Sequence, residues 1–154
     1  MLNKILSGAK EIAIGGHVRP DGDCVGSCMG LRQYIIENYP DKKVTVYLEE
    51  IPDSFQFLKG IEEIRSEISE NKVYDLFICL DCGDKGRLGF SAPLFEQAAH
   101  TFCVDHHISN VSFAMDNVIR PDASSTSELV YELLDKKRIS KETAEALYLG
   151  IVHD

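Results

Sequence analysis

The segment YDLFICLD, residues 74–81, constrains the fold of this chain more than any other stretch of its sequence. Its apolar side chains follow one another directly instead of alternating with polar ones, so both faces of the expected strand must be buried. Strands that are covered on both faces are typical of parallel sheets with helices on each side. The segment therefore predicts a central strand of a parallel sheet.

The rest of the chain alternates short apolar runs with longer mixed segments, which indicates an α/β domain with a mainly parallel sheet flanked by helices. The length of 154 residues, without a linker rich in Pro, Gly or Ser, suits one domain. Further strands are expected at 11–16, 43–49 and 100–107, helices at 24–38, 53–58, 91–99, 124–137 and 140–154, and partly helical structure at 61–69.

Local signals mark particular positions in the helices. Ser125 and Glu128 form the pattern of a capping box, and Ser140 is expected to cap the last helix. Gly26 and Gly30 lie one turn apart in the first long helix, and neither has a side chain that would keep a neighbour away. We therefore expect close backbone approach on that face of the helix.

The balance of charges excludes one class of protein. The formal net charge is −9, and no run of Lys and Arg offers the positive surface that a stand-alone duplex-binding module needs. No apolar run is long enough for a signal peptide or a membrane span, so a cytoplasmic location is the default expectation.

The chain has five cysteines, an odd number, and free thiols are expected rather than disulfides because no secretory segment is present. Cys79 and Cys82 form a CxxC pattern, for which a zinc or redox role is a weaker alternative. A zinc site needs a second pair of ligands at suitable spacing, and none stands out. We therefore interpret Cys79 as a small apolar residue at the end of a strand.

Titratable residues follow three of the expected strands at the point where each strand ends. They are His17, Asp21 and Asp23 after the first strand, Asp81 at the end of the third, and Asp105, His106 and His107 at the end of the fourth. Because ligands bind beyond the carboxyl ends of parallel strands, we expect these groups to meet at one edge of the sheet. The position of Asp154, in the last helix, does not follow from periodicity.

Four or five crowded carboxylates repel one another unless they are protonated or neutralised, and divalent cations are the usual remedy. Carboxylate and imidazole ligands together suit Mn²⁺, Fe²⁺ or Co²⁺, with Zn²⁺ and Mg²⁺ as further options. Two ions roughly 3.5–4 Å apart, bridged by one carboxylate, would fit this number of ligands. Structural explanations of single residues stay open. Asp23, taken alone, is equally well explained as the N-cap of the following helix. Asp21 and Gly22 could form only a turn after Pro20.

Five segments together resemble the motifs of the DHH phosphoesterases, the family that includes RecJ-like exonucleases. In chain order they are HVRPDGDCVGS, LDCGD, VDHHISN, SSTSELVYELL and YLGIVHD. The resemblance runs from His17 to Asp154 and is greatest for the branch of oligoribonucleases and 3′-phosphoadenosine-5′-phosphate (pAp) phosphatases called nanoRNases. It implies a Rossmann-like, three-layer α/β fold.

The resemblance also implies a role for individual residues at two Mn²⁺ ions, for which Mg²⁺ or Co²⁺ are possible substitutes. The implied ligands are His17 and Asp21 for one ion, Asp23, His106 and Asp154 for the other, and Asp81 as the bridge between them. Asp105 resembles a residue that orients its neighbours, and His107 one that meets the scissile phosphate. Arg87 and Ser125 are expected to face the substrate.

Members of this family continue past the last aspartate into a second domain, DHHA1, that contacts the nucleotide. The chain stops at Asp154. The resemblance therefore implies that residues 1–154 are a catalytic domain separated from its DHHA1 domain, which would also explain the missing basic surface. The full-length protein could be a homodimer, and the sequence leaves this question open.

The expected function is manganese-dependent hydrolysis of short single-stranded RNA and of pAp by a two-metal mechanism. Alternatives with the same chemistry are cleavage of cyclic dinucleotides, of inorganic pyrophosphate or of longer single-stranded DNA by an exonuclease. The alternative from another class is a non-catalytic nucleotide-binding module whose acidic residues are solvated. Metal titration separates this module from an enzyme.

Overall fold

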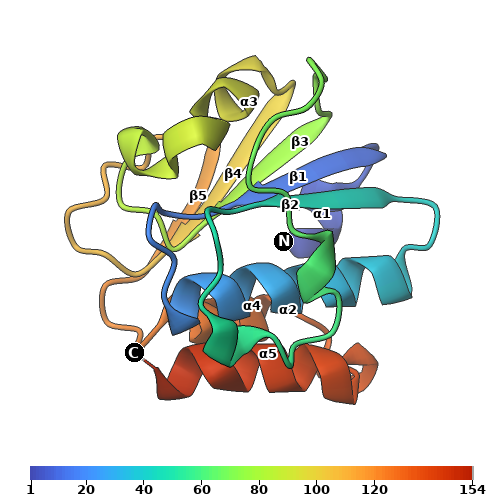
Figure 1. Ribbon diagram of the computed structural model, residues 1–154, viewed down its shortest axis with the longest axis vertical. Coiled ribbons are helices and arrows are strands. Elements are labelled where there is room, and N and C mark those ends of the chain that lie inside the picture. Colours follow the sequence, from blue (N-terminus) through green and yellow to red (C-terminus); the bar gives the residue numbers. More distant parts are fainter. Residues whose placement is uncertain (154) are drawn as a thin grey trace.

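Five parallel strands form one sheet in the computed structural model of the chain, which describes residues 1–153 (Figure 1). The strands are β1 (Glu11–Gly15), β2 (Lys43–Tyr47), β3 (Leu76–Leu80), β4 (His100–Asp105) and β5 (Asp116–Ile119), and their order in the sheet is β2-β1-β3-β4-β5. The helices are α1 (Leu2–Leu6), α2 (Gly22–Asn38), α3 (Ala92–Gln97), α4 (Thr126–Leu133) and α5 (Lys141–Val152). Each pair of neighbouring strands is parallel, which confirms the predicted fold class.

Helices cover both faces of the sheet, so the domain has three layers. Helices α2, α4 and α5 lie on one face, and α3 lies on the other (Figure 1). All five residues of β3 are buried, as the apolar run predicts: Ile78 belongs to the core on the α2 side, and Phe77 and Cys79 to the core on the α3 side. No helix in residues 1–153 is long and apolar enough to cross a membrane.

Helix α2 lies between the sheet and α5, and most of its residues are buried. The two helices cross closely where Gly26 faces α5. A Cβ atom at Gly26 would lie 2.5 Å from the carbonyl oxygen of Ala146 and 2.7 Å from the backbone nitrogen of Gly150. The expected close backbone approach on this face of α2 is therefore confirmed.

The capping predictions for the last two helices are confirmed. The hydroxyl of Ser125 accepts from the Glu128 amide at 3.0 Å, and the hydroxyl of Ser140 accepts from the Thr143 amide at 3.1 Å. The carboxylate of Glu128 accepts from the amide and the hydroxyl of Ser124, one residue before the N-cap.

Several predicted bounds are wrong because polar and apolar residues are not arranged there with a clear period. Helix α4 ends at Leu133 rather than at residue 137, since Leu134 turns into extended backbone and stays buried. The 53–58 and 61–69 segments contain only the 3-10 turns Asp53–Phe55 and Ile61–Glu63. The sequence patterns also missed α1 and β5, which are short; β5 is an edge strand with half-buried side chains.

Helix α2 offers a matched pair of substitutions that tests its packing. Gly26→Ala should destabilise the fold by about 1–3 kcal/mol, because the new methyl group meets the backbone of α5, which cannot turn away. Gly30→Ala meets side chains rather than the backbone of α5, namely Leu147 at 2.5 Å and the Cβ atom of Ala146 at 3.6 Å. The gain in helix propensity of up to about 1 kcal/mol offsets part of the cost, so this variant should lose less stability than Gly26→Ala. Urea unfolding followed by circular dichroism compares the two, and equal losses of stability would contradict this account of the helix crossing.

Candidate metal centre

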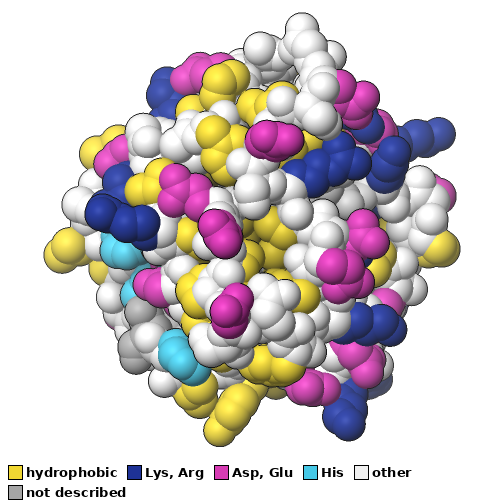
Figure 2. Space-filling model, viewed as in Figure 1, with side chains coloured by type: hydrophobic (Ala, Val, Ile, Leu, Met, Phe, Trp, Pro, Cys, Tyr) yellow, Lys and Arg dark blue, Asp and Glu magenta, His cyan; other side chains and the backbone are white. Residues whose placement is uncertain are grey.

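The order of the strands creates a crevice at one edge of the sheet. From β1 the chain crosses to β2 on one side, whereas from β3 it proceeds to β4 and β5 on the other side. The loops after β1 and β3 therefore lead to opposite faces of the sheet, and such a switch point is where parallel α/β sheets bind ligands. Figure 2 shows histidine side chains on the left of the molecule, the side where α2 begins in Figure 1.

A cavity of about 210 Å³ opens at this crevice. Its lining residues are His17, Asp21, Asp81, Gly83, Asp84, Arg87, His107 and Ser109. Five of the residues singled out from the sequence therefore share one cavity, although they come from three separate segments of the chain.

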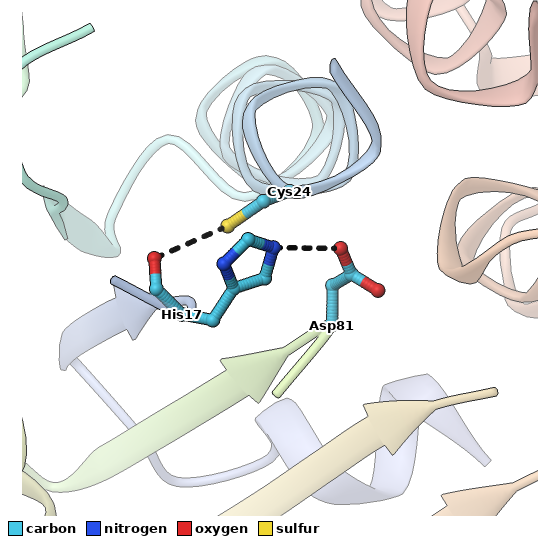
Figure 3. A group of neighbouring side chains, drawn as sticks. All are labelled: His17, Cys24 and Asp81. Carbon is cyan, nitrogen blue, oxygen red and sulfur yellow. Dashed lines mark hydrogen bonds and ion pairs between the residues drawn. The ribbon is translucent and has the colours of Figure 1, made fainter. Parts of the chain in front are cut away.

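His17 lies between two carboxylates in this cavity. Its Nε2 atom is 3.4 Å from Oδ2 of Asp81 and 3.5 Å from Oδ1 of Asp21. Its other ring nitrogen, Nδ1, donates to the carbonyl of Val18 at 2.6 Å. That bond fixes the orientation of the ring, so that Nε2 points at the two carboxylates; the approach to Asp81 is visible in Figure 3.

The same contacts change the pKa values of all three groups. Burial would lower the pKa of His17, but the contacts with Asp21 and Asp81 outweigh it and raise the pKa to about 11. The contact with His17 lowers the pKa of Asp21 to about 2, and burial raises the pKa of Asp81 to about 6. Protonated His17 thus partly neutralises the two carboxylates, and a cation bound at the same place would neutralise them in the same way.

A second group of ligand atoms lies on the other side of Asp81. The Nε2 atom of His106 is 3.6 Å from Oδ2 of Asp23 and 3.6 Å from Oδ1 of Asp81. Asp81 therefore turns one carboxylate oxygen toward His17 and the other toward His106. Its backbone adopts φ 56° directly after β3, a left-handed conformation that aspartate tolerates better than most residues.

These distances and atom types fit two cations. Separations of 3.4–3.6 Å exceed the length of ordinary hydrogen bonds. Two ligands that are each about 2.0–2.2 Å from one ion, at an angle near that of a tetrahedral or octahedral site, lie roughly 3–3.6 Å apart. Imidazole nitrogen together with carboxylate oxygen suits Mn²⁺, Co²⁺ or Zn²⁺. The residues present therefore fit a pair of divalent ions that share Asp81.

The structural interpretation of Asp23 as the cap of its own helix is wrong. Asp21 is the N-cap of α2, and its Oδ1 atom accepts from the amide of Cys24 at 3.0 Å. Asp23 is fully buried and accepts instead from the amides of Thr126 and Ser127, both at 2.9 Å, at the start of α4. The sequence reasoning missed these partners, which lie more than 100 residues away.

His107 is held by a second buried acid. Its Nδ1 atom lies 2.6 Å from Oδ1 of Asp105, whose other oxygen accepts from the side-chain amide of Asn110 at 2.9 Å. Asp105 is fully buried, whereas His107 lines the cavity. Asn110 was also missed as a separate residue, although it lies in the VDHHISN segment. The arrangement directs Nε2 of His107 away from Asp105. The orienting role expected for that acid stays a prediction.

The remaining predicted residues lie in different surroundings. Arg87 lines the cavity, as a residue facing the substrate would. Ser125 is fully buried and caps α4, and it does not line the cavity; its expected contact with the substrate stays a prediction. Asp154, the expected sixth ligand, lies outside the described residues.

All five cysteines are buried and free, which confirms the expectation of free thiols. Burial raises the pKa of the Cys79 thiol, so little of the reactive thiolate forms, and this disfavours a redox role for the CxxC pair. Cys24 lies beside the candidate ligand atoms. Its thiol donates to the carbonyl of His17 at 4.0 Å, and a possible ligand atom from each of Cys24, His17 and Asp81 lies within 4.8 Å of the others (Figure 3).

The comparison with known families agrees with this arrangement. A model described as the DHH family, N-terminal domain, matches residues 11–151. The chain belongs to the DHH family. The match includes the segments that carry His17, Asp81 and His106, so the two groups of ligand atoms lie within the shared domain.

Individual relatives differ in their substrates. The chain is 30% identical over 158 residues to the bifunctional oligoribonuclease and PAP phosphatase NrnA of Bacillus subtilis, covering 99% of this chain and 49% of NrnA. It is 29% identical over 170 residues to the cyclic-di-AMP phosphodiesterase GdpP of the same organism, covering 99% of this chain and 26% of GdpP. The chain thus spans half or less of the length of these curated relatives.

A solved structure supports the same assignment. An exopolyphosphatase-related protein from Bacteroides fragilis superimposes with a TM-score of 0.85 and 28% identity, covering 98% of this chain and 48% of that protein. The whole chain, and not only the loops at the crevice, therefore shares the architecture of this solved structure.

Binding of Mn²⁺ should depend on the two groups of ligand atoms described above. We expect calorimetric titration of the wild-type chain with Mn²⁺ to show saturable binding, and the triple variant His17→Ala, Asp81→Ala, His106→Ala to show none. His100→Ala is the matched control, because His100 pairs with Asp116 at the opposite end of the strands and should leave binding unchanged. Equal binding by the triple variant and the wild type would show that the ion binds elsewhere.

Proposed function

We propose that this chain is the catalytic domain of a manganese-dependent phosphoesterase that uses two metal ions. The observation that carries the proposal is the position of Asp81, whose two oxygens face His17 and His106 respectively. His17 and Asp21 would hold one ion, His106 and Asp23 the other, and Asp81 both. Asp154 is proposed as a further ligand of the second ion.

Bound divalent ions would polarise the phosphoryl oxygens and make water acidic enough to act as a nucleophile near neutral pH. The chain itself would orient the substrate. Arg87 offers a positively charged donor at the cavity wall, and His107 offers its Nε2 atom because Asp105 engages the opposite side of the ring. Together they would stabilise negative charge on the phosphoryl group as it is transferred.

Short RNA and pAp are the substrates that we propose, on the strength of the oligoribonuclease and PAP phosphatase named among the relatives. Cyclic dinucleotides are the second candidate, because a cyclic-di-AMP phosphodiesterase matches with nearly the same identity. The cavity of about 210 Å³ would hold the phosphoryl group next to Arg87 and His107.

The remaining parts of the proposal concern the whole protein. We propose that a DHHA1 domain supplies the basic contacts to the nucleotide that a chain of net charge −9 lacks. A cytoplasmic location, the default expectation from the sequence, stays part of the proposal. The homodimer considered for the full-length protein stays a prediction.

The experiment measures phosphate or nucleotide release from short RNA, pAp, cyclic-di-AMP, pyrophosphate and single-stranded DNA, with Mn²⁺ present. It uses the longest form of the protein that the gene encodes, with the 154 residues in parallel. We expect the highest kcat/KM for short RNA and pAp. A preference for cyclic-di-AMP would favour the second candidate, and no hydrolysis of any substrate would favour the non-catalytic module.

Asp81→Asn should reduce Mn²⁺-dependent hydrolysis by more than the roughly 10–100-fold that is typical for partners one contact further from a metal. The amide keeps the shape of the side chain but removes the charge that both ligand groups share. Asp116→Asn, at the opposite end of the strands, is the control and should retain full activity. Near-normal turnover of Asp81→Asn would show that the two-metal assignment is wrong.

A further inference from the structure

The start of α4 contacts two acids of the metal centre at once. The amide of Thr126 donates to Oδ2 of Asp23, and the amide of Ser127 donates to Oδ1 of the same carboxylate, both at 2.9 Å. The hydroxyl of Thr126 donates to Oδ1 of Asp81 at 3.1 Å. One residue of α4 therefore binds both the acid of the second ligand group and the acid that joins the two groups.

The contact from Thr126 fixes the rotation of the Asp81 carboxylate. Oδ1 receives the hydroxyl proton of Thr126 and lies 3.6 Å from His106, which leaves Oδ2 toward His17 at 3.4 Å. Rotation by a quarter turn would break the hydrogen bond and point neither oxygen at its histidine. A carboxylate that gives one oxygen to each of two ions would need this division of the two oxygens.

Capping of α4 does not account for the hydroxyl of Thr126. Ser125 is the N-cap, and its own hydroxyl accepts from Glu128. Thr126 is the first residue of the helix and is fully buried, where valine would fill the same volume without a polar atom. The hydroxyl is directed at Asp81, which is only 2% exposed.

We propose that Thr126 is a positioning residue of the metal centre, which orients Asp81 through its hydroxyl while the backbone at the start of α4 holds Asp23. The inference rests on the proposed two-metal function. It concerns how the ligands are held and not the chemistry of the ions. Removal of the hydroxyl should leave Asp81 in place but free to rotate, so that the affinity for Mn²⁺ falls together with turnover.

The decisive measurement is calorimetric titration with Mn²⁺ alone, without substrate, on the whole chain. Thr126→Val should bind Mn²⁺ about 10–100-fold more weakly than the wild type, as is typical when a partner of a metal ligand is lost. Thr126→Ser retains the hydroxyl and should restore the affinity to within a few fold. Thr126→Ala also lacks the hydroxyl and has a smaller side chain, and its affinity for Mn²⁺ should be as low as that of Thr126→Val.

Thr143→Val is the matched control, because Thr143 is also fully buried near the start of a helix. Its hydroxyl accepts from Ser140 at 3.2 Å, and within residues 1–153 it makes no hydrogen bond with the acids of the centre. We expect this variant to bind Mn²⁺ like the wild type, even where thermal unfolding shows that it and Thr126→Val lose similar stability. Loss of Mn²⁺ affinity in both variants alike would reduce the effect to general destabilisation and overturn the inference.

Other outcomes separate this inference from the proposed function. A folded Thr126→Val variant with wild-type affinity would overturn the inference and leave the proposed function standing, as would a Thr126→Ser variant as weak as Thr126→Val. Wild-type protein that binds Mn²⁺ but hydrolyses none of the substrates would contradict the proposed function. In that case, the Mn²⁺ affinities of the Thr126 variants would still decide the role of Thr126. Wild-type protein without saturable Mn²⁺ binding would overturn both.

Discussion

The parallel pairing of β1 with β3 is the interaction on which the candidate site depends. The register places Ile14 beside Ile78 and Gly15 beside Cys79, so the two strands end at the same level. His17 follows one strand and Asp81 follows the other, and their side chains meet at 3.4 Å only because of this register. A shift by one residue would turn each apolar side chain to the wrong face of the sheet, so the pattern that buries the core also positions the site.

Burial of several carboxylates is the main energetic difficulty of this arrangement. Asp23 and Asp105 are fully buried, and an isolated charge in such surroundings is strongly unfavourable. Asp23 is stabilised by two amides of α4, and Asp105 by His107 and Asn110. No buried side-chain nitrogen or oxygen among the described residues lacks a hydrogen-bond partner. These bonds allow the acids to stay in place with or without a cation, since the protein supplies part of the compensation itself.

The sequence predicts the contacts that depend on local patterns and misses those that join distant segments. The apolar run of β3 and the groups at the strand ends were sufficient for the sheet and for the position of His17 and Asp81. The hydrogen bonds between Asp23 and α4 connect residues more than 100 positions apart, and Thr126 is 45 positions from Asp81, so no period or spacing reveals them. The edge strand β5 was missed for a related reason, because half-buried side chains do not alternate clearly.

Helix packing and the metal centre are not independent in this fold. Gly150 of α5 faces Ser127 and the Oδ1 atom of Asp23, and any side chain there would collide with Ser127. Gly26, on the other side of the same crossing, allows the backbone of α5 to approach α2. The two glycines therefore bring three helices together directly behind Asp23. A larger residue at either position would displace α4 or α5, and because α4 donates to both Asp23 and Asp81, the disturbance would reach the ligand atoms as well as the core.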